Sequence, residues 1–190
     1  MMPCIFMRSS TIALAWLGSK GCMFGIKYIS FDAMTHVIHY KNGNVAKEGR
    51  GLSFFYFAPS SSVAAVPLGS NDLPFIFAET TLDQQSVSIQ GQISYRVADA
   101  RQLAELLDFT VDGRGIYKKN DLEKLNQRII NEAQTATASF IHGTGLKDAI
   151  RSAKKIEDRI TEGIRVSEAI KRLGVEVLGV NVLAVKASPE

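Results

Sequence analysis

The sequence predicts an α+β fold in which helices cover one face of a sheet built around a long central strand. The first observation is residues 85–97 (QSVSIQGQISYRV), where apolar and polar residues alternate strictly. This alternation is the period of a strand with one dry face, which needs a cover of helices. The second observation is that the long helical patterns all follow this strand, and the third is a valine-rich run at residues 175–186. We therefore expect an N-terminal meander of short strands, the central strand, helices packed on the sheet, and a final valine-rich strand.

The composition is that of one globular domain with a short additional segment. The chain has 190 residues, of which 46% are hydrophobic, enough to bury a real core. Its formal net charge of +3 permits attraction to an anionic lipid surface or to nucleic acid but requires neither. The cysteines, Cys4 and Cys22, both lie in the N-terminal stretch, so we expect a reducing compartment and no disulfide framework.

Residues 1–26 form a variable N-terminal segment that differs from the rest of the chain. Its apolar run, residues 11–17 (TIALAWL), is far shorter than the roughly 20 residues that span a bilayer. A cleaved signal peptide is the less favoured alternative, because the charged region before the run is thin and holds a lone Arg8. We expect a disordered or surface-lying tail, and the candidate membrane contacts in it are Ile12, Leu14, Trp16 and Leu17.

The domain is expected at residues 27–190 and opens with short strands. Strands at residues 35–41 and 44–48 flank Asn42-Gly43, a strong hairpin signal because both residues tolerate positive φ. The other short strands are expected at residues 52–57, 63–68 and 75–79, with Pro67 at a strand end or sheet edge and Pro74 just before the last.

A short helix and a long one follow the central strand. Asp99 and Gln102 have the spacing of a capping box for a helix that runs through Leu107. After a loop at residues 112–115, Asn120 caps the long helix, which Gly143 ends. Its apolar stripe has helical spacing and comprises Leu122, Leu125, Ile129, Ala133, Ala136 and Phe140.

A further helical pattern leads to the last strand. It begins at residues 146–150, continues through isoleucines with helical spacing, and stops at Gly174. The run at residues 175–186 (VEVLGVNVLAVK) is rich in valine, which favours a strand. Its alternation slips at Leu178-Gly179, where we expect a β-bulge.

Taken together, these stretches resemble the SPFH or Band 7 family (stomatin, prohibitin and flotillin), and specifically its bacterial members with an uninterrupted domain. The resemblance covers roughly residues 25–190 and lies in the order and spacing of the motifs, since none is diagnostic alone. The matching stretches are residues 47–52 (KEGRGL), 86–97 (ending in Tyr95-Arg96-Val97), 128–137 (RIINEAQTAT), 146–151 (LKDAIR) and 173–182 (LGVEVLGVNV).

This resemblance implies a non-enzymatic, membrane-associated scaffold that self-assembles and organises lipid or partner membrane proteins. The alternative is a regulatory binding module for a membrane protease or channel. The implied partners are membrane lipid, further copies of the chain when the following coiled coil is present, and such a protease or channel, with the domain on the cytoplasmic side. Family members usually continue into a charged coiled coil, which is absent after Glu190, so we expect these 190 residues to be monomeric or weakly dimeric.

No pattern indicates a catalytic, cofactor or metal site. His36 and His39 fall on opposite faces of an expected strand, so a shared metal is not expected. His142 stands at a helix end, where a charge partner is favoured over a base. Gly143-Thr144-Gly145 lacks the third glycine of the dinucleotide fingerprint. Residues 147–172 mix both signs of charge without an aromatic side chain, so nucleic acid is not an expected partner.

The aromatic run at residues 54–57 (FFYF) carries the sharpest functional hypothesis. Alternate side chains of a strand face opposite sides, so these rings cannot all enter one core. One interpretation is that the fold buries both sides. The other is that one parity, Phe55 with Phe57 or Phe54 with Tyr56, meets the bilayer interface, where aromatic rings are enriched. The resemblance places this strand near the membrane and favours the second interpretation, with Phe55 and Phe57 as candidate contacts.

Overall fold

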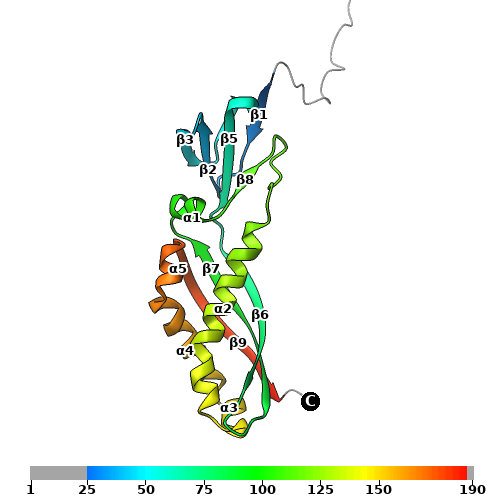
Figure 1. The fold of residues 1–190 in the computed structure, drawn as a ribbon, viewed down its shortest axis with the longest axis vertical. Coiled ribbons are helices and arrows are strands. Elements are labelled where there is room, and N and C mark those ends of the chain that lie inside the picture. Colours follow the sequence, from blue (N-terminus) through cyan, green and yellow to red (C-terminus); the bar gives the residue numbers. More distant parts are fainter. Residues whose placement is uncertain (1–24, 188–190) are drawn as a thin grey trace, which may run out of the picture.

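The computed structural model describes residues 25–187 and shows an elongated molecule, with small sheets at one end and helices along the rest (Figure 1). It is 35% helix and 42% strand, which confirms the α+β fold. The elements in chain order are β1 (Ile26–Ser30), β2 (Thr35–Lys41), β3 (Asn44–Arg50), β4 (Ser53–Phe57), the 3₁₀ turn η1 (Ala58–Ser60), β5 (Ser61–Pro67), β6 (Asn71–Thr80), β7 (Ser86–Val97), α1 (Ala100–Leu106), β8 (Thr110–Val111), α2 (Asp121–His142), α3 (Leu146–Arg151), α4 (Ala153–Val166), α5 (Glu168–Arg172) and β9 (Val175–Ala187).

The strands form three antiparallel sheets. β1 and β4 pair as a two-stranded ribbon, and β3, β2, β5 and β8 pair in that order as a four-stranded sheet. Both lie at the upper end of the molecule in Figure 1. The third sheet has the order β6-β7-β9 and runs along the rest of the molecule beside the helices (Figure 1).

The short strands lead into the central strand as expected, but they do not form one continuous meander, because β6 is the only one of them that pairs with β7. The earlier strands instead make the ribbon and most of the four-stranded sheet. β6 is also longer than expected and spans Asn71–Thr80. Pro74 does not shorten β6, because β6 is an edge strand. Some N–H groups of an edge strand have no partner in the sheet, so a proline, which lacks this group, is tolerated there. The two-residue β8 is too short to leave a signal in the sequence.

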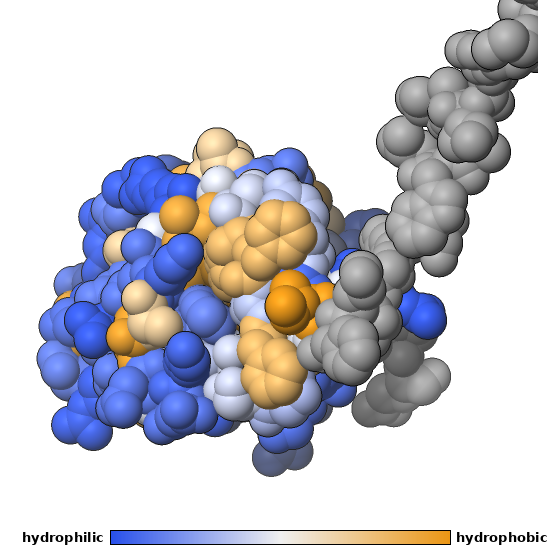
Figure 2. All heavy atoms as spheres, turned by 90° about the horizontal axis from the view of Figure 1, so that it is seen from above, coloured by the Kyte–Doolittle hydropathy of each residue, from blue (hydrophilic) through white to orange (hydrophobic). Residues whose placement is uncertain are grey.

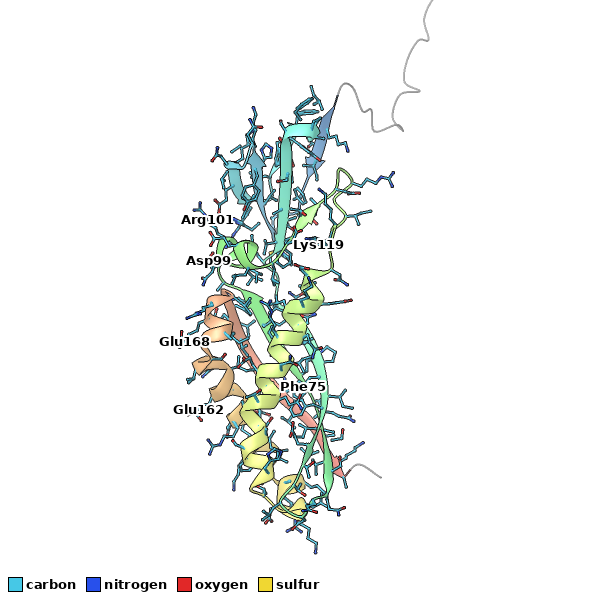
Figure 3. All side chains as sticks on the ribbon, in the orientation of Figure 1. Phe75, Asp99, Arg101, Lys119, Glu162 and Glu168 are labelled. Carbon is cyan, nitrogen blue, oxygen red and sulfur yellow. The ribbon has the colours of Figure 1, made fainter. Side chains whose placement is uncertain are left out.

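The central strand β7 has the two faces that its alternation predicts. Its dry-face side chains, from Val87 to Val97, are at most 5% exposed. Gly91 occupies one dry-face position, where a Cβ would lie 2.4 Å from the Asn181 carbonyl oxygen and 2.5 Å from Phe75 Cζ. The missing side chain therefore makes room for the Phe75 ring, which lies between the sheet and α2 (Figure 3).

The long helix α2 covers this dry face with residues spaced by four. The predicted stripe is right at its middle, through Ala133. Beyond it Thr137 and Ile141 are fully buried, whereas Ala136 and Phe140 are partly buried. The Thr137 hydroxyl donates to the Ala133 carbonyl oxygen at 2.8 Å. A threonine can therefore lie fully buried in this interface without an unsatisfied hydroxyl.

The second helical pattern is three helices rather than one, with breaks at Ser152 and Ser167. Ser167 caps α5, because its hydroxyl oxygen accepts from the Ile170 N–H. α4 packs against α2 so closely that a Cβ on Gly163 would lie 2.3 Å from Ala136 Cβ. A glycine at this crossing therefore sets how near the two helices approach.

The short helix α1 joins the two ends of the molecule. Asp99 caps it as predicted and accepts from the Arg101 and Gln102 N–H groups, both at 3.0 Å. The other half of the capping box is wrong, because the Gln102 side chain donates at 2.9 Å to the Arg172 carbonyl oxygen of α5. In Figure 3, Asp99 and Arg101 lie where the small sheets meet the helical part of the molecule. At the start of α2, Asn120 makes no side-chain capping hydrogen bond.

The final strand β9 confirms the bulge expected at Leu178 and has a second one at Leu183. Its register with β7 shifts at both places. A bulged residue leaves the in–out alternation, and these leucines are accordingly 47% and 74% exposed. Each lies outside the core that the neighbouring valines fill.

The structure has two hydrophobic cores, and β2 and β5 contribute to both. The large core lies between the three-stranded sheet and its helices, and it includes Ile38 and Val66. The small core lies between the ribbon and the opposite face of the four-stranded sheet, where Val37 and Ala65 are buried. The ribbon is thus held at the end of the molecule by the packing of the small core.

The two faces of β7 predict opposite outcomes for neighbouring substitutions. Ile93→Asp places an unpaired carboxylate at a fully buried position and should cost more than ~3 kcal/mol of unfolding free energy. Gln92→Asp lies on the open face and should change stability by less than ~0.5 kcal/mol. Urea unfolding of both variants measures the difference, and equal midpoints would mean that the faces are assigned wrongly.

Candidate functional site

The ribbon of β1 and β4 has one buried and one exposed face. The strands pair with Ile26 opposite Phe57 and Tyr28 opposite Phe55. These side chains are respectively 50%, 46%, 54% and 72% exposed, and we call them the ribbon face. The Tyr28 and Phe55 ring centroids lie 4.9 Å apart. The ribbon face is therefore a contiguous patch of apolar and aromatic groups in contact with solvent.

The alternate residues of the same strands face inward. Phe54 and Tyr56 are 6% and 8% exposed and, with Ile29, lie in the small core. The interpretation that the fold buries both sides of the aromatic run is therefore wrong. The other interpretation requires one exposed parity, and the exposed rings are the expected Phe55 and Phe57. Their contact with a membrane stays a prediction.

Figure 2 looks onto this end of the molecule, where orange side chains gather in a field that is otherwise largely blue. Exposed apolar patches of this kind on a soluble surface commonly mark an interaction site. The patch also lies close in the chain to the apolar run at residues 11–17. Residues 17 and 26 can be separated by at most about 30 Å of extended chain.

A turn at residues 112–116 lies beside β1. The Asp112 carboxylate accepts from the N–H groups of Arg114 at 2.7 Å and Ile116 at 3.0 Å, and these bonds hold the Asp112 pKa below its usual range. The turn leaves Arg114 and Ile116 exposed. A Cβ on Gly113 would lie 2.6 Å from Lys27 Nζ, so the side chain of Lys27 in β1 lies against the turn. Cationic groups therefore lie beside the ribbon, with Lys27 on the parity of β1 opposite to the ribbon face and Arg114 on the adjoining turn.

The structure describes only some of the other residues singled out in the sequence. Ile12, Leu14, Trp16 and Leu17 lie outside the described residues. His36 pairs with Glu48 at 3.0 Å, and His142 lies 3.3 Å from Glu79. Residues 25–187 contain no group of three or more potential metal ligands. Within the same range, no helix is both long and apolar enough to cross a bilayer.

Sequence reasoning found half of the ribbon face and missed the rest. Phe55 and Phe57 stand in an obvious aromatic run, whereas Ile26 and Tyr28 lie in a five-residue strand. A short alternation at residues 26–29 was the available signal. This alternation identifies an exposed face only once β1 is known to pair with β4, which lies more than twenty residues away in the sequence.

The parity of β4 yields a test that needs no ligand. Phe54→Ser removes a ring from the small core and should lower the unfolding free energy by about 3 kcal/mol. Phe55→Ser removes a ring that is 72% exposed and should cost less than ~1 kcal/mol. Chemical denaturation of this matched pair measures both effects. A larger loss for Phe55→Ser would contradict the assignment of faces.

Comparison with known proteins agrees with this architecture. The model of the SPFH domain / Band 7 family matches residues 34–190, so the matched stretch starts just after β1 and includes β4. The resemblance read from the sequence began earlier, near residue 25. No curated protein matches the chain. The match covers most of the sequence and runs from the hairpin of β2 and β3 to the final strand. The chain therefore belongs to the SPFH/Band 7 family.

Proposed function

We propose that this chain is the membrane-associated domain of a scaffold, and that it rests on lipid through the ribbon face. The observation that carries the proposal is the exposure of Ile26, Tyr28, Phe55 and Phe57 together at one end of the elongated molecule. Members of the SPFH/Band 7 family are generally non-enzymatic scaffolds, which supports a binding role over a catalytic one. The lipid surface would lie on the cytoplasmic side.

The chemistry of the ribbon face suits the boundary between headgroups and acyl chains. Aromatic rings are enriched at this depth, because one part of the ring is apolar and another tolerates water. Burial of a large apolar side chain contributes about 1.5–3 kcal/mol when complete. The ribbon face is partly shielded already, so its four side chains provide a few kcal/mol at most. One copy would therefore bind weakly and reversibly.

Two further features would strengthen this contact. Each basic residue near an anionic leaflet contributes about 1 kcal/mol, and Lys27 of β1 and Arg114 of the adjoining turn lie at the same end of the molecule as the ribbon face. Self-assembly would then multiply a weak contact, because linked copies bind a surface with far higher apparent affinity than one. We propose that such assembly, driven by a coiled coil of the kind that follows the domain in family members, is the way this scaffold organises lipid. Partner membrane proteins, including a protease or channel, would be recruited to the assembly.

Vesicle binding tests the proposal. The chain should co-sediment with vesicles that contain phosphatidylglycerol, and Phe55→Ser combined with Phe57→Ser should reduce the bound fraction severalfold, because the variant loses the rings that enter the interface. The matched control is Ile76→Ser with Leu183→Ser, which removes two exposed apolar groups (66% and 74%) from the three-stranded sheet. This control should bind as the unaltered chain does.

Removal of residues 1–22 should also weaken vesicle binding, because it deletes the apolar run at residues 11–17. Equal loss from the ribbon variant and the sheet control would contradict the proposed site. Failure of the unaltered chain to bind at all would contradict the proposed membrane contact.

A further inference from the structure

His39 lies directly beneath the ribbon and is buried in an unusual way. It is 7% exposed, and neither of its ring nitrogens has a hydrogen-bond partner among the described residues. They are the only buried side-chain nitrogen or oxygen atoms in residues 25–187 of which this is true. Buried polar groups are nearly always paired, and an unpaired one costs stability. This position therefore tolerates a polar ring where an apolar one would be more stable.

The ring is packed against the two inward aromatic residues of β4. The centroid of His39 lies 4.9 Å from that of Phe54 and 6.1 Å from that of Tyr56. Phe55 and Phe57 of the ribbon face alternate with these residues on the same short strand. His39 thus contacts the inner side of the strand whose outer side forms the proposed membrane contact.

Among residues 25–187, no carboxylate faces His39 to stabilise its charged form. On β2 the next residue of the same parity is Lys41, and the cross-strand neighbour on β3 is Lys47. β5 contributes Val63, and β4 contributes the Tyr56 phenol as its titratable group. Asp112 acts on Tyr56, whose pKa is raised chiefly by burial. Burial, followed by the positive charges of Lys47 and Lys41, holds the His39 pKa below its ordinary value.

Packing, rather than strand pairing, joins the ribbon to the four-stranded sheet. Neither β1 nor β4 pairs with a strand of the four-stranded sheet. Backbone hydrogen bonds join the ribbon to that sheet near its ends, as from Asn42 N to the Ser60 carbonyl oxygen after β4. Between its ends, the ribbon is held to the sheet by the small core, in which Phe54 and Tyr56 lie against β2 and β5. A charge placed in this core would weaken that contact.

We propose that neutral His39 holds the ribbon against the four-stranded sheet and that its protonation releases the ribbon. We call this arrangement the latch. Protonation of His39 in mildly acidic solution loosens the ribbon from the four-stranded sheet and strengthens attachment of the ribbon to a lipid surface. The attachment is stronger because the loosened ribbon can offer lipid Phe54 and Tyr56 as well as the ribbon face. This inference rests on the proposed membrane contact, and it adds regulation by pH to that contact.

The sign of the effect follows from proton linkage. Because the folded protein disfavours the charged imidazole, the loosened state binds the proton more readily than the latched state. The ribbon is therefore held most firmly to the four-stranded sheet above the ordinary histidine pKa of about 6.5. This attachment weakens as the pH falls below that value. His36 serves as a control position on the same strand, because its ring is paired with Glu48 and lies outside the small core.

The first measurement follows the latch in solution without lipid. Hydrogen exchange of the β1 and β4 amides is compared at about pH 7.5 and about pH 5.5, after correction for the intrinsic pH dependence of exchange. Protection of these amides should fall severalfold at the lower pH in the unaltered chain. It should stay constant in His39→Leu, which fills the site with an apolar side chain. His39→Gln, also unable to gain a proton, repeats the test should the leucine variant not fold.

The second measurement is vesicle co-sedimentation at the same pH values. The bound fraction should rise at the lower pH for the unaltered chain and for the control His36→Gln, but not for His39→Leu. An equal rise in His39→Leu, or unchanged exchange of the ribbon amides in the unaltered chain, would overturn the latch. Absence of vesicle binding at both pH values would instead overturn the proposed membrane contact. In that case the exchange data alone would decide whether His39 releases the ribbon.

Discussion

The structure depends on one constraint, the burial of both faces of the strand pair β2 and β5. Neighbouring residues of this pair enter different cores, as Val37 and Ile38 show. The Ile38 face joins the large core that the helices cover, and the Val37 face supports the ribbon. A slip of one residue in this pairing would exchange the two sets of side chains and expose both cores. The exposed ribbon face is thus a consequence of how β2 and β5 are filled.

The contiguous aromatic patch lies at one end of an elongated molecule, and the two edges of the long sheet carry features that disfavour pairing with other strands. The outer strand β6 carries Pro74 and Asp72, which are residues that discourage edge pairing. The opposite edge is partly covered, because the Val182 N–H of β9 donates to the Glu157 carboxylate of α4 at 3.5 Å. The helices present charged groups such as Glu162 and Glu168 outward (Figure 3). Protected edges and a charged flank suit a domain that meets lipid by its end.

The sequence predicts the features that arise from local periodicity and misses those that arise from distant pairing. The faces of β7, the hairpin at Asn42-Gly43 and the bulge at Leu178 follow from alternation and turn chemistry. The division of the short strands into a ribbon and a separate sheet does not, because those pairings are tertiary. The same limit applies to the site. Phe55 and Phe57 are visible in the sequence, whereas the pairing with β1 and the burial of His39 depend on the folded sheets.

The central claim is that the ribbon face enters the lipid interface, and tryptophan quenching tests it most directly. The sole tryptophan of the chain, Trp16, is replaced by phenylalanine, and a new one is introduced by Phe55→Trp or, as the control, by Ile76→Trp on the three-stranded sheet. With vesicles of brominated phospholipid, the emission of the residue 55 variant should shift to the blue and be quenched, while that of the control stays unchanged. Quenching of the control without quenching at residue 55 would contradict the account.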